Sequence, residues 1–194
     1  HYPEDYLSYV GVGQVIDVIE NEQLSYDFAL KKAIEENNEQ AMFELGNIGR
    51  PNENGEYNDE TGYDITIKWV SYFGGDLFGK KSTAEIEEHL INHEIYKDYQ
   101  TELEAGWEFS QILFEDSDVR FFDARKKVPS VEIPVYFFVG RTDYDTPFEL
   151  VEDYYARLIS PKKQLIWFEN SSHFPFYSEP EKFNSVLIEK LIID

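Results

Sequence analysis

An acid and a histidine near the end of the sequence have the types and spacing needed for proton transfer. Asp143 follows the apolar run VYFFVG (135–140), and His173 follows LIWFENSS (165–172). A carboxylate that accepts a hydrogen bond from one imidazole nitrogen fixes the tautomer of the ring and stabilises the imidazolium that forms during catalysis. We therefore predict that Asp143 orients His173 and that His173 acts as a general base.

The alternative is that these side chains have only local structural roles. Asp143 and Asp145 would then cap the helix that follows them, and His173 would be a polar loop residue. Asp145 lies close to Pro147, a residue type that suits the first turn of a helix, so Asp145 fits a capping role under either interpretation.

The elements around both residues predict a parallel sheet. The run 135–139 is apolar without alternation, which is typical of a strand buried on both faces, and 162–170 is predicted to be a second buried strand. Helices that begin near a proline are expected at 147–159 and 179–192. Helical connections between such strands produce parallel pairing. Because reactive groups collect at the carboxyl ends of parallel strands, the acid and the histidine are expected to meet there.

The earlier part of the sequence is predicted to contain one strand and then mostly helices. Residues 6–16 are rich in Val, Ile and Tyr and contain two glycines, which favours a strand that ends in a tight turn. Residues 17–127 are rich in Glu, Asn and Lys and carry helical patterns around a polar loop at 50–64. The expected helix boundaries are Ser25 as an N-cap, Gly46 or Gly49 as a stop, and Ser82 with Glu85 as a capping box.

Two stretches, VYFFVGRTDYDTPFEL (135–150) and ENSSHFPFYSEPEKFNSVL (169–187), resemble the last two strand–loop units of the α/β-hydrolases, specifically the proline iminopeptidase-like branch. The opening HYPEDYLSYVGVGQV (1–15) resembles the segment after the nucleophile helix of that family. The resemblance implies an α/β fold class: the C-terminal part of an α/β-hydrolase fold, with parallel strands, flanking helices and an inserted helical cap. The implied domains are 1–16 as the sixth-strand segment, 17–127 as the cap (lid), and 128–194 as the C-terminal β-α-β-α unit.

The same resemblance implies roles for four residues. Asp143 would be the triad acid and His173 the general base, in the Ser…Asp…His order of the fold. Glu20 and Glu22 would hold the amino terminus of a substrate, as cap carboxylates do in the resembled peptidases, unless they belong to a solvated helix face. The implied activity is aminopeptidase-like hydrolysis of a peptide, amide or ester bond in a peptide or small molecule, without a cofactor.

The nucleophile of that mechanism is not found in the sequence. The family needs a serine in a G-x-S-x-G elbow, and no serine of this chain has glycine at both flanking positions; cysteine is absent. We expect the serine to lie upstream of His1 and the chain to be an inactive fragment by itself. Its open strand edge near 9–15 would then pair with a complementary N-terminal fragment or a second copy. The alternative is a non-catalytic binding or interaction module on an α/β-hydrolase-derived scaffold.

Composition excludes several partners and sites. The chain carries 17 basic and 39 acidic side chains, a net charge of −22, so nucleic acids and anionic membranes are not expected to bind. No apolar run approaches the roughly 20 residues of a membrane span. The lack of cysteine excludes disulfides and thiolate metal sites and agrees with a cytoplasmic location.

Two further motifs are incomplete. His89 and His93 are spaced as zinc ligands on a helix, but Leu90 and Asn92 stand where the glutamates of zinc-protease signatures would be, so no metal is predicted. GVGQVI (11–16) begins like a dinucleotide-binding loop but lacks the third glycine.

Overall fold

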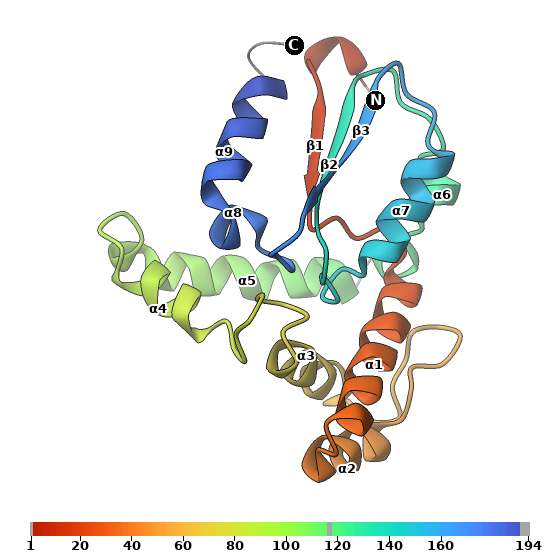
Figure 1. The fold of residues 1–194 in the computed structure, drawn as a ribbon, viewed down its shortest axis with the longest axis vertical. Helices are drawn as coiled ribbons and strands as arrows, with labels where there is room; N and C mark the ends of the chain where they lie inside the picture. The colour runs from red at the N-terminus through yellow and green to blue at the C-terminus, as the bar shows by residue number, and fades with distance from the viewer. Residues whose placement is uncertain (1, 116–117, 191–194) are drawn as a thin grey trace.

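A parallel sheet forms the centre of the upper part of the molecule in Figure 1. The structure, a computed structural model, describes residues 2–115 and 118–190. Within them the strands β1 (Tyr9–Val12), β2 (Val135–Gly140) and β3 (Lys163–Phe168) pair in the order β1-β2-β3, all parallel. The prediction of a parallel sheet is confirmed.

Helices cover both faces of this sheet. On one face lie α6 (Ala124–Lys127) and α7 (Phe148–Arg157), and on the other lie α8 (Pro175–Ser178) and α9 (Pro180–Ile188) (Figure 1). Side chains of β2 alternate between two cores: Phe137 packs with the α7 residues Leu150 and Val151, whereas Phe138 packs with Phe168 and α9. The alternation of side chains along a strand explains how one apolar run serves both faces.

The second strand of the predicted pair is less buried than expected. Every residue of β2 is buried, but in β3 only Phe168 is fully buried, and Gln164 is exposed. The prediction that 162–170 is a buried strand is therefore wrong in its burial and right in its position. The cause is the place of β3 at an edge of the sheet, where it has only one neighbouring strand among the described residues.

The carboxyl ends of the strands point toward a helical region (Figure 1). Its first three helices, α1 (Val18–Glu35), α2 (Glu39–Ile48) and α3 (Gly62–Tyr72), share a separate apolar core. The predicted stop at Gly49 is confirmed: it ends α2 with φ 69°, a conformation that glycine adopts without strain.

The predicted N-cap at Ser25 is wrong. The cap of α1 is Asp17, whose Oδ1 accepts a hydrogen bond from the Glu20 amide at 2.9 Å. Ser25 lies inside the helix, is buried, and its hydroxyl donates to the Tyr144 carbonyl at 2.7 Å. A serine whose hydroxyl bonds a backbone carbonyl far along the chain looks the same as an N-cap serine in the local sequence.

Two more helices complete this region, α4 (Ala84–Asn92) and α5 (Gln100–Glu115). The residue that caps α4 is Thr83 and not Ser82, although the Ser82 hydroxyl accepts a hydrogen bond from the Ala84 amide at 3.0 Å. The side chain of Glu85 lies outside the described residues. Short 3-10 helices occur at Pro3–Asp5, Lys97–Tyr99 and Asp118–Phe121.

Arg125 forms ion pairs with residues at both ends of the helical region, near Asp17 and near Asp123. The segments around Asp17 and Asp123 run antiparallel, and Arg125 bonds both carboxylates, at 2.6 and 2.9 Å. It also contacts Glu20 at 2.8 Å and Asp153 of α7 at 3.6 Å. Because Asp17 and Asp123 are buried, this guanidinium supplies the positive charge that makes their burial tolerable.

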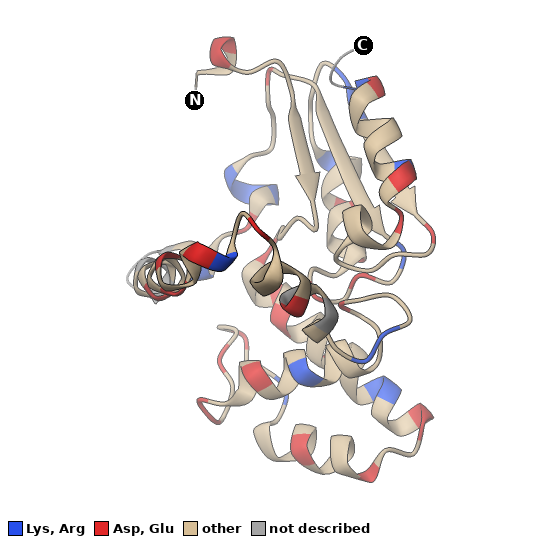
Figure 2. Cartoon of the chain, turned by 90° about the vertical axis from the view of Figure 1, so that its left-hand side faces the viewer, with Lys and Arg blue, Asp and Glu red and all other residues tan. Residues whose placement is uncertain are grey.

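Acidic side chains are spread over both the helical region and the sheet region (Figure 2). Basic residues are fewer and lie scattered among them (Figure 2), so the net charge of −22 is a property of the whole surface. In the part of the chain that the structure describes, no helix is long and apolar enough to cross a membrane.

Candidate active site

Asp143 and His173 come together at the carboxyl ends of β2 and β3, as we expect for residues that follow neighbouring parallel strands. The Asp143 carboxylate is 1% exposed, and its Oδ2 lies 3.2 Å from His173 Nδ1. The Thr146 hydroxyl donates to the same Oδ2 at 2.9 Å. Asp143 Oδ1 accepts the amides of Asp145 and Thr146, at 3.1 and 2.8 Å. One oxygen of Asp143 therefore orders its own loop and the other faces the imidazole, but neither caps α7, so the capping alternative is wrong for Asp143.

Close backbone packing holds the two loops against each other. The Thr142 amide donates to the Ser171 carbonyl at 3.2 Å, and the hydroxyls of Thr142 and Ser172 lie 2.8 Å apart. The helical region also takes part, because the His173 amide donates to the Asp76 carbonyl at 2.9 Å. The position of the imidazole thus depends on both β-loops and on the loop after α3.

Gly13, directly after β1, forms one wall behind the imidazole. Its φ of 54° is in the left-handed region, and a Cβ at this position would lie 2.7 Å from His173 Nδ1. Glycine is required here both for the backbone conformation and for the space that the ring fills. The sequence indicated a turn at this point but not its contact with His173.

Asp145 occupies an unexpected place. Its Oδ2 lies 3.3 Å from His173 Nε2, on the ring nitrogen that Asp143 does not contact. The capping interpretation of Asp145 is wrong, because Pro147 is the residue before α7 and no side chain caps that helix. The imidazole is thus held between two carboxylates.

Glu22 and Glu20 face different surroundings. Glu22 accepts a hydrogen bond from the Tyr57 hydroxyl at 3.0 Å and interacts electrostatically with Asp145. Glu20 instead bonds Arg125. Residues two apart on a helix do not share a face, which explains the separation. Only Glu22 is therefore associated with the His173 site.

We call Glu22, Asp76, Asp143 and Asp145 the acidic cluster. Burial raises the pKa of Glu22 to about 7, even though the Tyr57 hydrogen bond opposes the shift. Burial and the neighbouring acids raise the pKa of Asp145 to about 6. Burial alone would lower the pKa of His173, but the hydrogen bond and charge of Asp143, with the charges of Asp145 and Asp76, raise that pKa to about 9. The cluster therefore favours bound protons and other cations.

These shifts predict that the chain becomes less stable as pH rises. Asp145, Glu22 and His173 have folded pKa values of about 6, 7 and 9, each above its ordinary value. The folded protein then holds more protons than the unfolded chain, so stability falls through the pH interval between the two values. Between pH 6 and 9, where His173 dominates, we expect a loss on the order of 2 kcal/mol in urea unfolding.

The variant His173→Gln serves as the control for this prediction. It lacks the titrating ring, so most of the pH dependence above pH 6 should disappear from its unfolding curve. A wild-type stability that rises with pH over this range would contradict the prediction.

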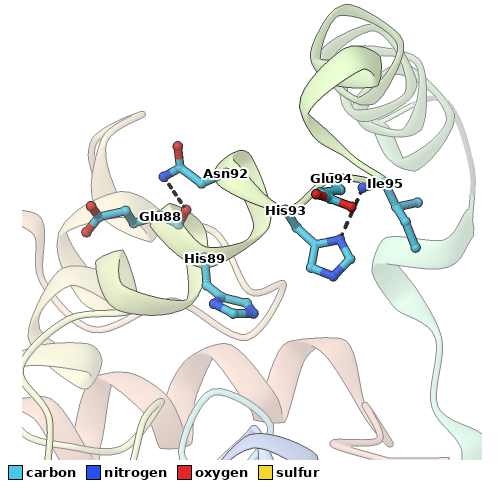
Figure 3. Close-up of a pocket in the computed structure, with 6 residues that line it drawn as sticks. All are labelled: Glu88, His89, Asn92, His93, Glu94 and Ile95. Carbon is cyan, nitrogen blue, oxygen red and sulfur yellow. Dashed lines mark hydrogen bonds between the residues drawn. The ribbon is translucent and has the colours of Figure 1, made fainter.

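His89 and His93 border an open depression of about 700 Å³ on the surface of α4 (Figure 3). His89 is exposed and His93 is half-buried. Their ring centroids lie 6.1 Å apart, and His93 Nδ1 accepts a hydrogen bond from the Ile95 amide at 3.2 Å. Across the described ranges 2–115 and 118–190, no group of three or more His, Cys, Asp or Glu is arranged to hold a metal ion. This depression and the His173 site share no residues.

Comparisons with known proteins agree with the hydrolase resemblance, although no family model matches the chain. It is 38% identical over 82 residues to a protein of Bacillus subtilis strain 168 named probable aminopeptidase YbaC, a match of 42% of this chain and 26% of YbaC. It is 25% identical over 122 residues to the AB hydrolase superfamily protein YisY of the same organism, covering 63% of this chain and 41% of YisY. The chain thus spans less than half the length of either relative.

A solved structure extends the likeness to nearly the whole chain. An α/β fold family hydrolase from Bacillus anthracis strain Sterne superposes with a TM-score of 0.51 and 18% identity, over 98% of this chain and 60% of that one. The fold is therefore that of the α/β-hydrolases, as the resemblance predicted, and the sequence relatives carry hydrolase and aminopeptidase names.

Proposed function

We propose that this chain supplies the acid and base of a serine-hydrolase triad, Asp143 and His173, and that the nucleophilic serine comes from a segment outside these residues. The observation that carries the proposal is the buried Asp143 carboxylate, 3.2 Å from His173 Nδ1 at the carboxyl end of the central strand. The reaction class is hydrolysis of a peptide, amide or ester bond.

In the proposed reaction each proton has a defined path. Asp143 holds the Nδ1 proton, so Nε2 is the nitrogen that accepts the proton of the serine hydroxyl as its oxygen attacks the carbonyl carbon. The imidazolium then gives this proton to the leaving group, and the acyl-serine is released by a water molecule that His173 deprotonates in the same way. Asp145 must yield its place at Nε2 for the serine hydroxyl to reach it.

The acidic cluster favours substrates with a free amine. Glu22 and Asp145 are half-buried carboxylates whose raised pKa values reflect the cost of holding several negative charges together. A substrate ammonium group would relieve that cost. The name of the relative YbaC, probable aminopeptidase, supports this substrate class.

A fluorophosphonate probe, which modifies activated serines, tests the proposal. We expect it to label one serine in the complete gene product that contains these residues and to leave the isolated 194-residue chain unlabelled. A complete product that is never labelled would contradict the proposal and favour a non-catalytic binding module. Labelling of the isolated chain would contradict the proposal that the nucleophilic serine lies outside these residues.

The amine preference is measured on the same protein with a matched pair of substrates, one with a free amine and one with that amine acetylated. We expect kcat/KM to favour the free amine, and Glu22→Gln to reduce the preference by about tenfold, the loss of one charged contact. Glu20→Gln is the matched control on the same helix, because Glu20 bonds Arg125 and should leave the preference unchanged.

A further inference from the structure

The carboxylate of Asp145 covers the ring nitrogen that the proposed reaction needs. Its Oδ2 lies 3.3 Å from Nε2 of His173, whereas Asp143 contacts Nδ1. In the part of the chain that the structure describes, no other hydrogen bond or ion pair involves the Asp145 carboxylate. A general base accepts a proton at a nitrogen that is free and deprotonated. An anion at Nε2 favours the protonated ring and occupies the place of the serine hydroxyl.

Helix α1 holds the loop of Asp145 through three residues on one of its faces. Asn21, Ser25 and Phe28 are spaced by four and three residues, so they line the same side of the helix. The Asn21 side-chain amide donates to the Asp145 carbonyl at 2.8 Å, and the Ser25 hydroxyl donates to the Tyr144 carbonyl at 2.7 Å. The rings of Phe28 and Tyr144 stack with their centroids 4.0 Å apart. α1 therefore fixes both carbonyl groups of residues 144–145.

The two amides of the same dipeptide are bonded as well. The Tyr144 amide donates to the Gly75 carbonyl at 2.8 Å, and the Asp145 amide donates to Asp143 Oδ1 at 3.1 Å. A shift of this backbone would break several hydrogen bonds at once, at a cost for each. The Asp145 carboxylate is held by a single contact, so rotation about its side-chain torsions is the motion that can uncover Nε2.

The charges around the imidazole indicate what would cause this rotation. The other titratable groups that act on His173 or Asp145 from the surrounding elements are acids and one phenol, namely Glu22, Asp76, Asp143 and Tyr63. The imidazolium is thus the cation that offsets the Asp145 charge. A substrate ammonium beside Glu22 and Asp145 would compete with it for the Asp145 carboxylate. Such a ligand shifts the equilibrium toward the state it binds better, here the state with Nε2 uncovered.

We propose that Asp145 is a gate on the general base. Without substrate its carboxylate covers Nε2 of His173, and a substrate ammonium that pairs with Asp145 uncovers this nitrogen, while α1 keeps the backbone of 144–145 in place. The inference rests on the proposed function and deepens it, because the substrate amine then takes part in turnover and not only in binding. Asp145 makes the enzyme prefer free amines in kcat, whereas Glu22 makes it prefer them in KM.

Kinetics of Asp145→Asn in the complete gene product test the gate. With the free-amine and acetylated substrates, we expect wild-type kcat to be about tenfold higher for the free amine, the effect of one charged contact. In Asp145→Asn this kcat ratio should approach one, chiefly because kcat for the acetylated substrate rises. Asparagine keeps the size of the side chain but has no charge to hold a proton on Nε2. Glu22→Gln should instead raise KM for the free amine and leave the kcat ratio near its wild-type value.

The pKa of His173 reports on the contact independently of turnover. NMR of the histidine rings of the complete product measures it, and the signal that disappears in His173→Gln identifies the residue. Asp145→Asn should lower this pKa from about 9 by about one pH unit or more, the usual effect of an opposite charge within about 4–6 Å. The acidic limb of the kcat profile for the acetylated substrate should move to lower pH with it.

Asn21→Ala and Gln23→Ala form a matched pair on α1, since each side chain donates to backbone carbonyls. Gln23 bonds the carbonyls of residues 51–52, at 3.3 and 2.7 Å, and not the loop of Asp145. Asn21→Ala frees the Asp145 carbonyl and loosens the gate, so the pKa of His173 should fall, by less than in Asp145→Asn. Gln23→Ala should leave both this pKa and the kcat ratio unchanged.

The outcomes distinguish the gate from the proposed function. An unchanged His173 pKa and an unchanged kcat ratio in Asp145→Asn would overturn the gate alone, in a product that the serine probe labels. A lower kcat for both substrates would also overturn it, because Asp145 would then assist the reaction. A fall of the pKa in a product that the probe never labels would refute the hydrolase function, and the gate with it, while the contact of Asp145 with Nε2 would stand.

Discussion

Under the proposed function, replacing His173 with glutamine in the complete gene product is expected to lower kcat by about 10³-fold, within the 10² to 10⁴ that a positioned general base contributes. Glutamine fills similar space but cannot accept the serine proton. Asp143→Asn should cause a loss of comparable size, because the amide does not hold the imidazole in the tautomer that leaves Nε2 free to accept a proton. Steady-state kinetics of both variants measure these losses.

The control for these variants is His89→Gln. His89 is exposed on α4 and shares no contact with the acidic cluster, so its replacement should leave kcat unchanged. Circular dichroism of each variant checks that the fold is intact. Folded His173→Gln and Asp143→Asn proteins with wild-type kcat would exclude the proposed roles of both residues.

The high pKa of His173, about 9, is not the value expected of a general base at neutral pH. The charges that raise it include Asp145, which lies at Nε2, the nitrogen that accepts the serine proton in the proposed reaction. Under the proposed function, a substrate ammonium beside Glu22 and Asp145 offsets part of this negative charge, and His173 then releases its proton more readily. The acidic limb of the pH–rate profile should accordingly lie at lower pH for the free-amine substrate than for its acetylated counterpart.

The meeting of Asp143 and His173 could be predicted from the sequence because it depends on strand periodicity and on the direction of parallel strands. Both properties are local or follow from general rules of chain connection. The contact of Asp145 with Nε2 could not be predicted, since local sequence made a helix cap equally reasonable. The choice between the two depends on how the loop after β2 turns.

The same limit applies to residues whose partners lie far along the chain. Glu20 and Glu22 are equivalent in the sequence, and their partners distant along the chain, Arg125 for Glu20 and Tyr57 for Glu22, distinguish them. Ser25 was mistaken for a cap because its partner, the Tyr144 carbonyl, is distant in sequence. The exposure of β3 follows from its position at the edge of the sheet. The order of strands in a sheet cannot be predicted from the composition of one strand.

Gly140→Ala is expected to destabilise the isolated chain by about 3 kcal/mol or more, at or above the upper end for forced overpacking. Gly140 ends β2, where the loops that carry Asp143 and His173 cross at close range. An added Cβ would collide with the Ser172 carbonyl oxygen and lie 2.7 Å from that of Ser171. Both obstacles are backbone atoms that cannot rotate away, so the loops must separate. Urea unfolding of the variant and the wild type measures the loss.

Gly46→Ala is the matched control, because it adds the same methyl group where no atom lies within 4 Å. Gly46 is exposed inside α2, so alanine there should stabilise the chain by up to about 1 kcal/mol through its higher helix propensity. Opposite signs at the two positions would show that close loop packing, and not glycine content, sets the cost at Gly140. A Gly140→Ala chain as stable as the wild type would mean that the two loops do not lie as close as described, and the placement of His173 beside Asp143 would fall with it.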